Sequence, residues 1–402
     1  MGRDLRSALF AGTSGRVSGC HCAIRHHFNI RPRGARNRED SKRSRGEGLS
    51  TVLEPERRNE IMKGLFGPMK IPAVFLLYTL SAFAQGWIPQ TSGTTASLRA
   101  VSAAVSASVV WASGSRGTWL RTTDAGNTWQ SGQVAGAGDL DFRGVRGFGD
   151  RTAILLSAGA GDKSRIYKTN DGGAHWTLLF TNPDAKGFFD AIAFWDTRRG
   201  IVVGDAVDGH MTVFTTADSG AHWMRRQTPP ALPDEGAFAA SNSCLTVRGR
   251  GDAWFGTGGP GSARVFHSKD AGATWTVVAT PIRNDGPGAG IFSIAFRDSK
   301  HGIAVGGDYS KDKEPRQNIA VTRDGGLTWT APAGAPPRGF RSAVAYVAGR
   351  KMWIATGTSG SDLSADDGAS WTAFDDGSYN ALSVAPGGSV WAVGANGRIA
   401  RR

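Results

Sequence analysis

Hydrophobic and polar residues alternate in short runs along this chain from residue 85 to its end. Each run opens with an aromatic residue or leucine, continues as a β-branched strand, and is followed after a turn by a second strand that ends in glycine. Clear examples are 98–101 with 110–114, 189–192 with 201–204, 292–295 with 303–306, and 340–343 with 353–357. A period of two residues with glycine-rich turns is typical of β-hairpins, and the region shows no amphipathic helical period. The pattern therefore predicts an all-β protein.

Between these strand pairs a second pattern, S/T-x-D-x-G-x-x-W, occurs six times. Its aspartates are Asp124, Asp171, Asp218, Asp270, Asp324 and Asp366. Its tryptophans are Trp129, Trp176, Trp223, Trp275, Trp329 and Trp371. Successive aspartates lie 47, 47, 52, 54 and 42 residues apart, which is the length that one four-stranded propeller blade requires. The spacing therefore predicts a β-propeller.

Each copy of this motif suits a tight hairpin between the last two strands of a blade. The carboxylate can accept hydrogen bonds from backbone N–H groups of its own turn, and the glycine supplies a position with φ above zero. The tryptophan opens the next strand and packs between neighbouring sheets. Because the copies fall on separate blades, we expect a structural role and no shared catalytic or metal-binding cluster. The motif resembles the Asp-box of BNR-type propellers such as sialidases.

The strand pattern indicates seven blades although there are only six Asp-box motifs. It occurs a last time at 381–385, 390–394 and 397–400, where the chain stops one strand short of a blade. At the other end, residues 87–90 resemble the strand that follows a motif tryptophan, but no other strands of a blade precede them. Pairing the two ends completes a seventh blade and removes the last open sheet edges. We predict a seven-bladed propeller closed by an N-terminal strand; six blades with an additional tail is the alternative.

The net charge of +13 comes mostly from residues that precede the propeller. Residues 1–61 hold 13 Lys and Arg against 7 Asp and Glu, whereas 85–402 carry a net charge of only +5. The first 61 residues also lack periodic hydrophobicity, which is typical of a disordered basic leader. We therefore expect no nucleic-acid partner for the propeller.

Residues 62–84 have the three parts of a secretory signal peptide. Lys63 and Lys70 precede the apolar run 71–80, and a small-x-small cleavage site ends at Ala84. The apolar run is too short to span a bilayer, so we predict no transmembrane segment. We expect cleavage near Ala84 and export to the periplasm or the medium. Residues 1–61 are then interpreted as upstream sequence wrongly assigned as coding; a genuine basic arm is the alternative.

Few residues are available for metal or disulfide chemistry. Cys20 and Cys22 precede the propeller, which leaves Cys244 alone within it, and the histidines have no ligand spacing. We therefore expect no disulfide, no metal and no cofactor.

The first strand of each blade lines the central channel of a propeller, and ligands usually bind at a mouth of that channel. Aligning the first strands places these residues at matching positions: Arg99, Arg143, Asp190, Ala239, Ser293, Arg341 and Asn380. Ring closure makes the blades of Arg341, Asn380, Arg99 and Arg143 consecutive, so three guanidinium groups would form an arc that binds a carboxylate or a phosphate. Polar insertions add Asp205 and Asp308 at the mouth. The alternative is that each arginine pairs with a neighbouring carboxylate.

Seven Asp-box-like blades, six of which carry the motif, behind a signal peptide resemble the photosystem II assembly and stability factor family over residues 86–402. The resemblance implies an exported, monomeric and non-enzymatic scaffold that binds a protein or an anionic ligand. A sialidase-like glycoside hydrolase is the alternative, with Tyr309, Glu235 and Asp190 as candidate catalytic residues beside the three arginines. The sialidase F/Y-R-I-P signature is absent, because Arg99 is followed by alanine and valine.

Overall fold

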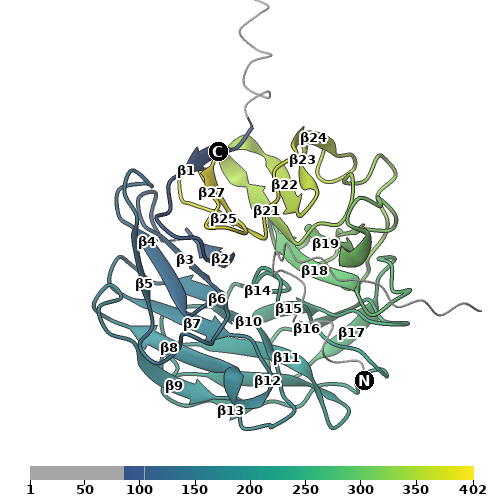
Figure 1. Ribbon diagram of the computed structural model, residues 1–402. Coiled ribbons are helices and arrows are strands. Elements are labelled where there is room, and N and C mark those ends of the chain that lie inside the picture. The colour runs from purple at the N-terminus through teal and green to yellow at the C-terminus, as the bar shows by residue number, and fades with distance from the viewer. Residues whose placement is uncertain (1–85, 104) are drawn as a thin grey trace, which may run out of the picture. The chain divides into compact units, whose positions relative to one another are not determined.

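The computed structural model describes residues 86–103 and 105–402, which form seven small antiparallel sheets (Figure 1). The prediction of an all-β, seven-bladed propeller is confirmed. The predicted basic leader (1–61) and signal peptide (62–84) lie outside the described residues. Within the described part of the chain, no helix is both long and apolar enough to cross a membrane.

The first four blades are four-stranded meanders. Blade 1 contains β2 (Leu98–Ser102), β3 (Val110–Gly114), β4 (Thr118–Thr122) and β5 (Gln130–Gln133). Blade 2 contains β6 (Phe142–Gly147), β7 (Ala153–Ser157), β8 (Arg165–Thr169) and β9 (Thr177–Thr181), with a 3₁₀ turn, η1 (Gly161–Lys163). Blade 3 contains β10 (Phe189–Phe194), β11 (Gly200–Val207), β12 (His210–Thr216) and β13 (Met224–Arg225). Blade 4 contains β14 (Leu245–Arg248), β15 (Asp252–Gly256), β16 (Arg264–Ser268) and β17 (Thr276–Ala279).

Blade 6 is also a four-stranded meander, whereas blade 5 has three strands and blade 7 takes its outermost strand from the N-terminal end of the propeller. Blade 5 contains β18 (Ala289–Phe296), β19 (Gly302–Asp308) and β20 (Ile319–Thr322), with η2 (Tyr309–Lys311). Blade 6 contains β21 (Ala343–Val347), β22 (Met352–Gly357), β23 (Gly360–Ser364) and β24 (Thr372–Asp375), with η3 (Ala348–Arg350). Blade 7 contains β25 (Ala381–Val384), β26 (Val390–Val393), β27 (Ile399–Arg401) and β1 (Ile88–Gln90).

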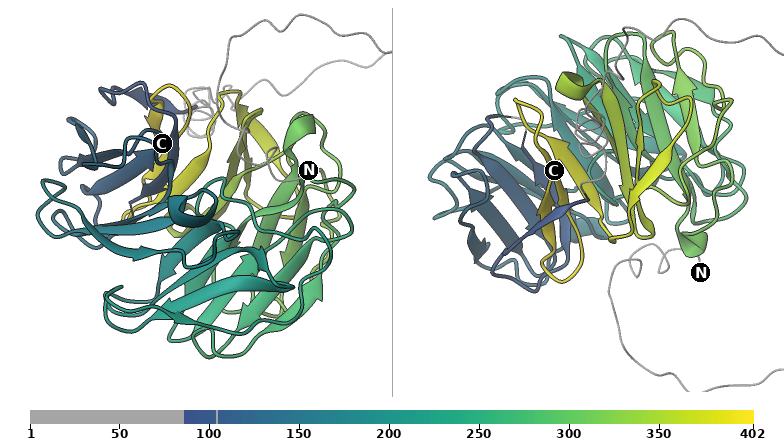
Figure 2. Two further views of the ribbon diagram at one scale, coloured as in Figure 1. Left: turned by 60° about the horizontal axis from the view of Figure 1, so that its bottom comes forward. Right: turned by 90° about the horizontal axis from the view of Figure 1, so that it is seen from above.

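The first strands of the seven blades form a closed ring around the central axis (Figure 1), and Figure 2 shows the blades from two further sides. Neighbouring first strands are in contact all the way round, from β2 through β6, β10, β14, β18, β21 and β25 back to β2. Every blade therefore presents one strand to the centre, and a site at the centre can draw side chains from all of them.

The two ends of the propeller meet in blade 7. β1 pairs antiparallel with β27, with Ile88 opposite Arg401 and Gln90 opposite Ile399. Trp87 is buried just before β1, where its Nε1 donates to Ser361 Oγ at 2.9 Å. The first described residues thus supply the outermost strand of the blade that the C-terminal residues begin.

Blade 5 lacks a full fourth strand. Val321 and Thr330 form one isolated bridge, and Pro332 follows, which cannot donate a hydrogen bond to a ladder. The chain then turns to blade 6, where Gly334 N–H donates to Ala369 O at 3.0 Å. This segment therefore joins two blades at their outer edge.

The six Asp-box motifs form tight turns after the third strand of blades 1 to 6. In the first of them, Asp124 Oδ1 accepts the backbone N–H of Thr128 at 2.9 Å, and Thr122 Oγ1 accepts that of Gly126 at 2.9 Å. Gly126 has φ of 88°, which the turn requires. The other five aspartates accept the equivalent backbone N–H at 2.8–3.0 Å. Each carboxylate is therefore used within its own turn.

Aromatic side chains fill the spaces between neighbouring blades. Trp129 of blade 1 packs edge-on against Trp391 of blade 7, with ring centroids 5.7 Å apart. Trp176 of blade 2 packs in the same way against Trp111 of blade 1, with centroids 6.2 Å apart. Each motif tryptophan here joins its blade to the preceding one, so the core of the protein is a set of layers between blades.

Candidate functional site

Arg99 and Arg143 lie side by side, as the sequence predicts, but they share a carboxylate. Each occupies a β-bulge in the first strand of its blade. Arg143 Nε donates to Asp141 Oδ2 at 2.8 Å, and Arg99 Nε lies 3.5 Å from the same oxygen. Arg99 is only 3% exposed and Arg143 only 6%. Burial lowers the pKa of Arg99 to about 10, although Asp141 opposes that shift. The pair is therefore built into the channel wall.

Arg341 does not lie beside these two residues, which corrects the prediction of a three-arginine arc. Its backbone N–H donates to Gly306 O, as that of Leu98 donates to Gly394 O, so Arg341 occupies the place of Leu98, one residue before the bulge. Its side chain is 0% exposed, and its Nε donates to Asp362 Oδ2 at 2.6 Å. A shift of one residue moves a side chain to the other side of a strand. Arg341 therefore belongs to the interior of blade 6.

The other predicted ligand-binding residues hold the backbone in place. Asn380 is 2% exposed and its Nδ2 donates to Leu98 O at 2.8 Å, which ties blade 7 to blade 1. Asp205 accepts the backbone N–H of Ala237 at 3.1 Å. Asp308 accepts that of Ser310 at 2.9 Å and so caps η2. Each of these side chains orders a loop or a strand end.

The three residues proposed for a sialidase-like reaction occupy buried or packed positions. Glu235 has a fully buried side chain that forms a salt bridge with Arg264, and it accepts the Thr257 hydroxyl at 2.6 Å. Asp190 is 1% exposed at the bulge of β10. Tyr309 packs edge-on against Phe292, with ring centroids 6.3 Å apart.

The channel is crossed by a segment of blade 4, residues 236–243, that precedes β14. Arg143 Nη1 donates to Ala239 O at 3.3 Å, and Ser241 Oγ donates to Ser342 O at 2.7 Å. Asn242 Oδ1 accepts the backbone N–H of Ile192 at 2.8 Å. These bonds reach blades 2, 6 and 3, so the crossing segment spans the centre of the ring.

Phe238 of the crossing segment completes an aromatic cluster in the channel. It stacks on Phe292 of blade 5 with ring centroids 3.8 Å apart, and Phe340 packs edge-on against Phe292 at 4.6 Å. Phe292 occupies the bulge of β18 that the sequence alignment gave to Ser293. The aromatic rings and the crossing segment fill this part of the channel.

A central cavity of about 650 Å³ lies on the other side of the crossing segment. Side chains from the first strands of all seven blades line it, and Asn242 and Ser243 of the crossing segment contribute to its lining. Three arginines, Arg146, Arg248 and Arg297, also line the cavity. Among its described lining residues there is no aspartate or glutamate. The cavity therefore favours an anionic ligand.

Arg146 is the residue of this cavity that the sequence analysis missed. It pairs with Ile154, and the residues in the same register of the other six blades are all small: Ser102, Ala193, Thr246, Ala295, Ala345 and Ser383. In the described part of the chain no carboxylate lies within 4.0 Å of Arg146, and its Nε is buried without an acceptor. Its pKa is lowered by burial. An alignment of this register position across the seven first strands would have identified Arg146 from the sequence alone.

Basic loops surround the cavity. We call the loops between the first and second strands of blades 2 to 6 the rim loops; they are residues 148–152, 195–199, 249–251, 297–301 and 348–351. They contain eight Lys or Arg and three Asp. Arg151 and Arg198 accept backbone N–H groups of the adjacent Asp-box turns on their carbonyl oxygens, both at 2.8 Å. The rim loops and the Asp-box turns therefore share one face, which we call the cavity face.

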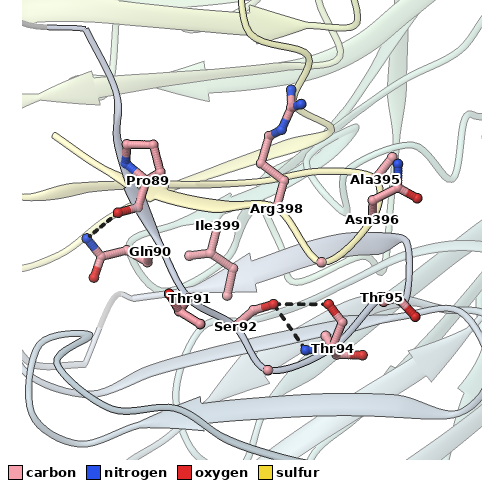
Figure 3. A pocket seen from close by; sticks show the side chains of 12 residues that line it. Pro89, Gln90, Thr91, Ser92, Thr94, Thr95, Ala395, Asn396, Arg398 and Ile399 are labelled. Atoms are coloured by element: carbon pink, nitrogen blue, oxygen red, sulfur yellow. Dashed lines mark hydrogen bonds between the residues drawn. The ribbon is translucent and has the colours of Figure 1, made fainter.

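A second hollow of about 710 Å³ follows the seam between β1 and β27 (Figure 3). It is lined by residues 89–95 and 395–399. Ser92 Oγ and Thr94 bond to each other at 3.3 Å, and Arg398 Nη1 donates to Ser378 O at 3.0 Å. The Ser92 hydroxyl and one donor of Arg398 are thus engaged by nearby protein atoms, whereas the central cavity contains an arginine without a carboxylate partner among the described residues.

The described residues contain no arrangement suited to metal binding, and their cysteine, Cys244, is buried. No group of His, Cys, Asp and Glu among the described residues is arranged to hold a metal ion. Cys244 is 0% exposed, and burial raises the pKa of its thiol far above the ordinary value. A protonated, inaccessible thiol is a poor nucleophile.

Comparison with solved structures finds proteins of similar fold. It is similar to YCF48 bound to a D1 peptide, with a TM-score of 0.58 and 17% identity over 79% of this chain and 96% of that one. It is also similar to YCF48 from Cyanidioschyzon merolae, with a TM-score of 0.57 and 16% identity over 79% and 98% of the two chains. The WD40 propeller domain of Doa1 matches with a TM-score of 0.50 and 13% identity over 79% and 96%. The expected resemblance to the photosystem II assembly factor is therefore confirmed as a resemblance of fold. No protein-family model and no curated protein matches the chain.

Proposed function

We propose that this protein is an exported, monomeric and non-enzymatic propeller that binds acidic segments of a partner polypeptide on its cavity face. The single observation that carries the proposal is the central cavity, which is lined by three arginines and, among its described residues, by no carboxylate. The rim loops extend this positive surface outward with eight basic and three acidic residues.

The arginines of the cavity differ in how far they are neutralised. Arg297 is paired with Asp298 at 3.3 Å and with Asp367 at 3.1 Å. Arg248 is exposed at the end of β14, and Arg146 is without a carboxylate partner in the described residues. Charge-assisted hydrogen bonds to carboxylates are about twice as strong as neutral ones. Arg146 and Arg248 are therefore the groups most available to an acidic ligand.

Two further considerations favour a polypeptide as the ligand. A propeller of this fold, YCF48, has been solved with a D1 peptide bound, so the architecture supports peptide binding in that protein. Trp195 and Tyr346 also line the cavity, and aromatic side chains of this kind are enriched where proteins bind proteins. Export, as the signal peptide at 62–84 predicts, would keep the basic face away from cytoplasmic nucleic acid.

The proposal is tested by binding of a fluorescent oligoglutamate peptide to the purified propeller, followed by fluorescence polarisation. The variant R198Q/R250Q/R350Q removes three exposed charges from the rim loops. The matched control R116Q/K313Q/R316Q removes three exposed charges from loops between second and third strands, on the opposite face. We expect the rim variant to bind roughly tenfold more weakly and the control to bind like wild type. Equal affinities of the two variants would contradict the proposal.

The salt dependence of binding provides a second criterion. Because the rim charges are exposed, we expect affinity to fall steeply between low salt and about 0.5 M NaCl. A single-stranded oligonucleotide is a second polyanion and serves as the control ligand. Tighter binding of the oligonucleotide than of oligoglutamate would contradict the proposal of an acidic polypeptide partner.

The glycoside hydrolase alternative is tested by incubating the propeller with sialosides and other anionic glycosides. We expect no turnover. Reproducible turnover that is lost in Tyr309→Phe would replace the scaffold proposal with the sialidase-like alternative.

A further inference from the structure

We propose that the central cavity receives the free C-terminal carboxylate of a partner polypeptide, with Arg146 as the residue that binds it. This inference rests on the proposed function and specifies which part of the partner enters the cavity.

The crossing segment makes the cavity blind. Asn242 of that segment bonds to Ile192 through both its amide oxygen, at 2.8 Å, and its amide nitrogen, at 3.1 Å. Ser243 Oγ bonds to Ser293 Oγ at 2.7 Å. The segment is therefore tied to blades 3 and 5 at the level where it lines the cavity. A polypeptide cannot pass through the ring here, so a strand that descends along the axis must end in the cavity.

The side chains around Arg146 leave room for such an end. At its register the other six blades carry only serine, alanine or threonine, so a single long side chain projects from a ring of short ones. A ring of seven long side chains would fill this space. The arrangement instead combines an open volume with one guanidinium group.

Arg146 differs from Asn242, Ser243 and Arg297 of the cavity in its lack of a polar partner among the described residues. The polar groups of Asn242 and Ser243 are engaged by other blades, and Arg297 is paired with aspartates. The guanidinium of Arg146 lies over the ring of Phe148, 5.7 Å from its centroid, and its buried Nε donates to no acceptor among the described residues. A guanidinium presents donors in a planar fork that matches the two oxygens of a carboxylate. An entering terminal carboxylate would supply the missing acceptors.

The test compares two oligoglutamate peptides of the same sequence, one with a free C-terminal carboxylate and one with a C-terminal amide. We expect the free acid to bind wild type roughly tenfold to a hundredfold more tightly than the amide, as expected for a charge-assisted hydrogen bond. Arg146→Gln should bind the two peptides equally. Arg250→Gln, which removes an exposed charge from a rim loop, should weaken both peptides by the same factor and so preserve the difference.

The two proposals fail in different ways. Equal affinity of free acid and amide for wild type overturns the terminal-carboxylate site but leaves acidic-peptide binding intact. Absence of binding by either peptide at low salt overturns the proposed function itself. If Arg146→Gln unfolds, Arg146→Lys keeps the charge without the planar fork and should retain only part of the preference for the free acid. A full preference in Arg146→Lys with a separate loss on Arg248→Gln would assign the terminus to Arg248 and overturn the role of Arg146.

Discussion

Arg341 and Asp362 form an ion pair in which both side chains are 0% exposed. Arg341 Nε donates to Asp362 Oδ2 at 2.6 Å, and Arg338 Nε lies 3.3 Å from the other carboxylate oxygen. The pair joins β23 to the segment that leads into β21 and therefore fixes where the chain enters blade 6. A charge that is buried in this way is costly when its partner is removed.

Replacement of Arg341 by methionine should destabilise the propeller strongly. The carboxylate of Asp362 would stay buried with only Arg338 nearby, so we expect a loss of roughly 3 kcal/mol in the free energy of unfolding. The double variant R341M/D362L removes both charges and should recover most of this loss. Urea unfolding at neutral pH measures both; a single variant as stable as wild type would contradict the burial of the pair.

The tryptophans between blades should differ in their contributions to stability according to burial. Trp391 is 0% exposed and packs against Trp129, so Trp391→Ala should cost roughly 3–5 kcal/mol. Trp275 of the fourth Asp-box motif is only half-buried, and its replacement should cost less. Thermal unfolding of both variants gives the comparison. A larger loss of stability on replacement of Trp275 than on replacement of Trp391 would contradict this dependence on burial.

Acid should weaken the Asp-box turns. Hydrogen bonds from Thr128 lower the pKa of Asp124 to about 2, compared with its ordinary value of 3.8. Because the folded pKa lies below the unfolded one, the stabilisation is complete above the unfolded value and is lost as the pH falls toward the folded value. We expect the unfolding midpoint in urea to fall between about pH 4 and pH 2. In Asp124→Asn this decline should be shallower, whereas an identical pH profile would mean that the carboxylate contributes nothing.

Deletion of residues 86–90 should open blade 7. The variant loses β1 and buried Trp87, which leaves the outer edge of β27 unpaired. We expect the Tm to fall by roughly 10 °C or more and self-association to appear in size-exclusion chromatography with light scattering. A synthetic peptide covering 86–91 should restore part of the Tm. A monomeric variant with the Tm of wild type would mean that the strand is dispensable.

The fold was predictable because its signal is repeated. The six Asp-box motifs and the seven strand pairs carry the same information several times, so an error in one blade does not change the number of blades. The Asp-box aspartates could be assigned to separate turns for the same reason: their spacing alone excludes a shared site.

The site was less predictable because it depends on the register of single strands. The sequence Phe-Arg-Ser-Ala at 340–343 resembles Leu-Arg-Ala-Val at 98–101. The following strand differs, however, because β22 has one more residue between its tryptophan and its final glycine than β3 has. The extra residue shifts Arg341 out of the channel position. The crossing segment of blade 4 matches no other blade, so repetition gave no information about it.

The seam in blade 7 also decides when this protein can fold. β1 (Ile88–Gln90) and its partner β27 (Ile399–Arg401) lie far apart in the sequence, with the other six blades between them. A ribosome makes a chain from its N-terminus, so β1 is made long before β27 and has no partner until β27 follows. The ring therefore cannot close before β27 has been made. Until then the early blades form an open arc whose apolar flanks lack the neighbours that cover them in the closed ring.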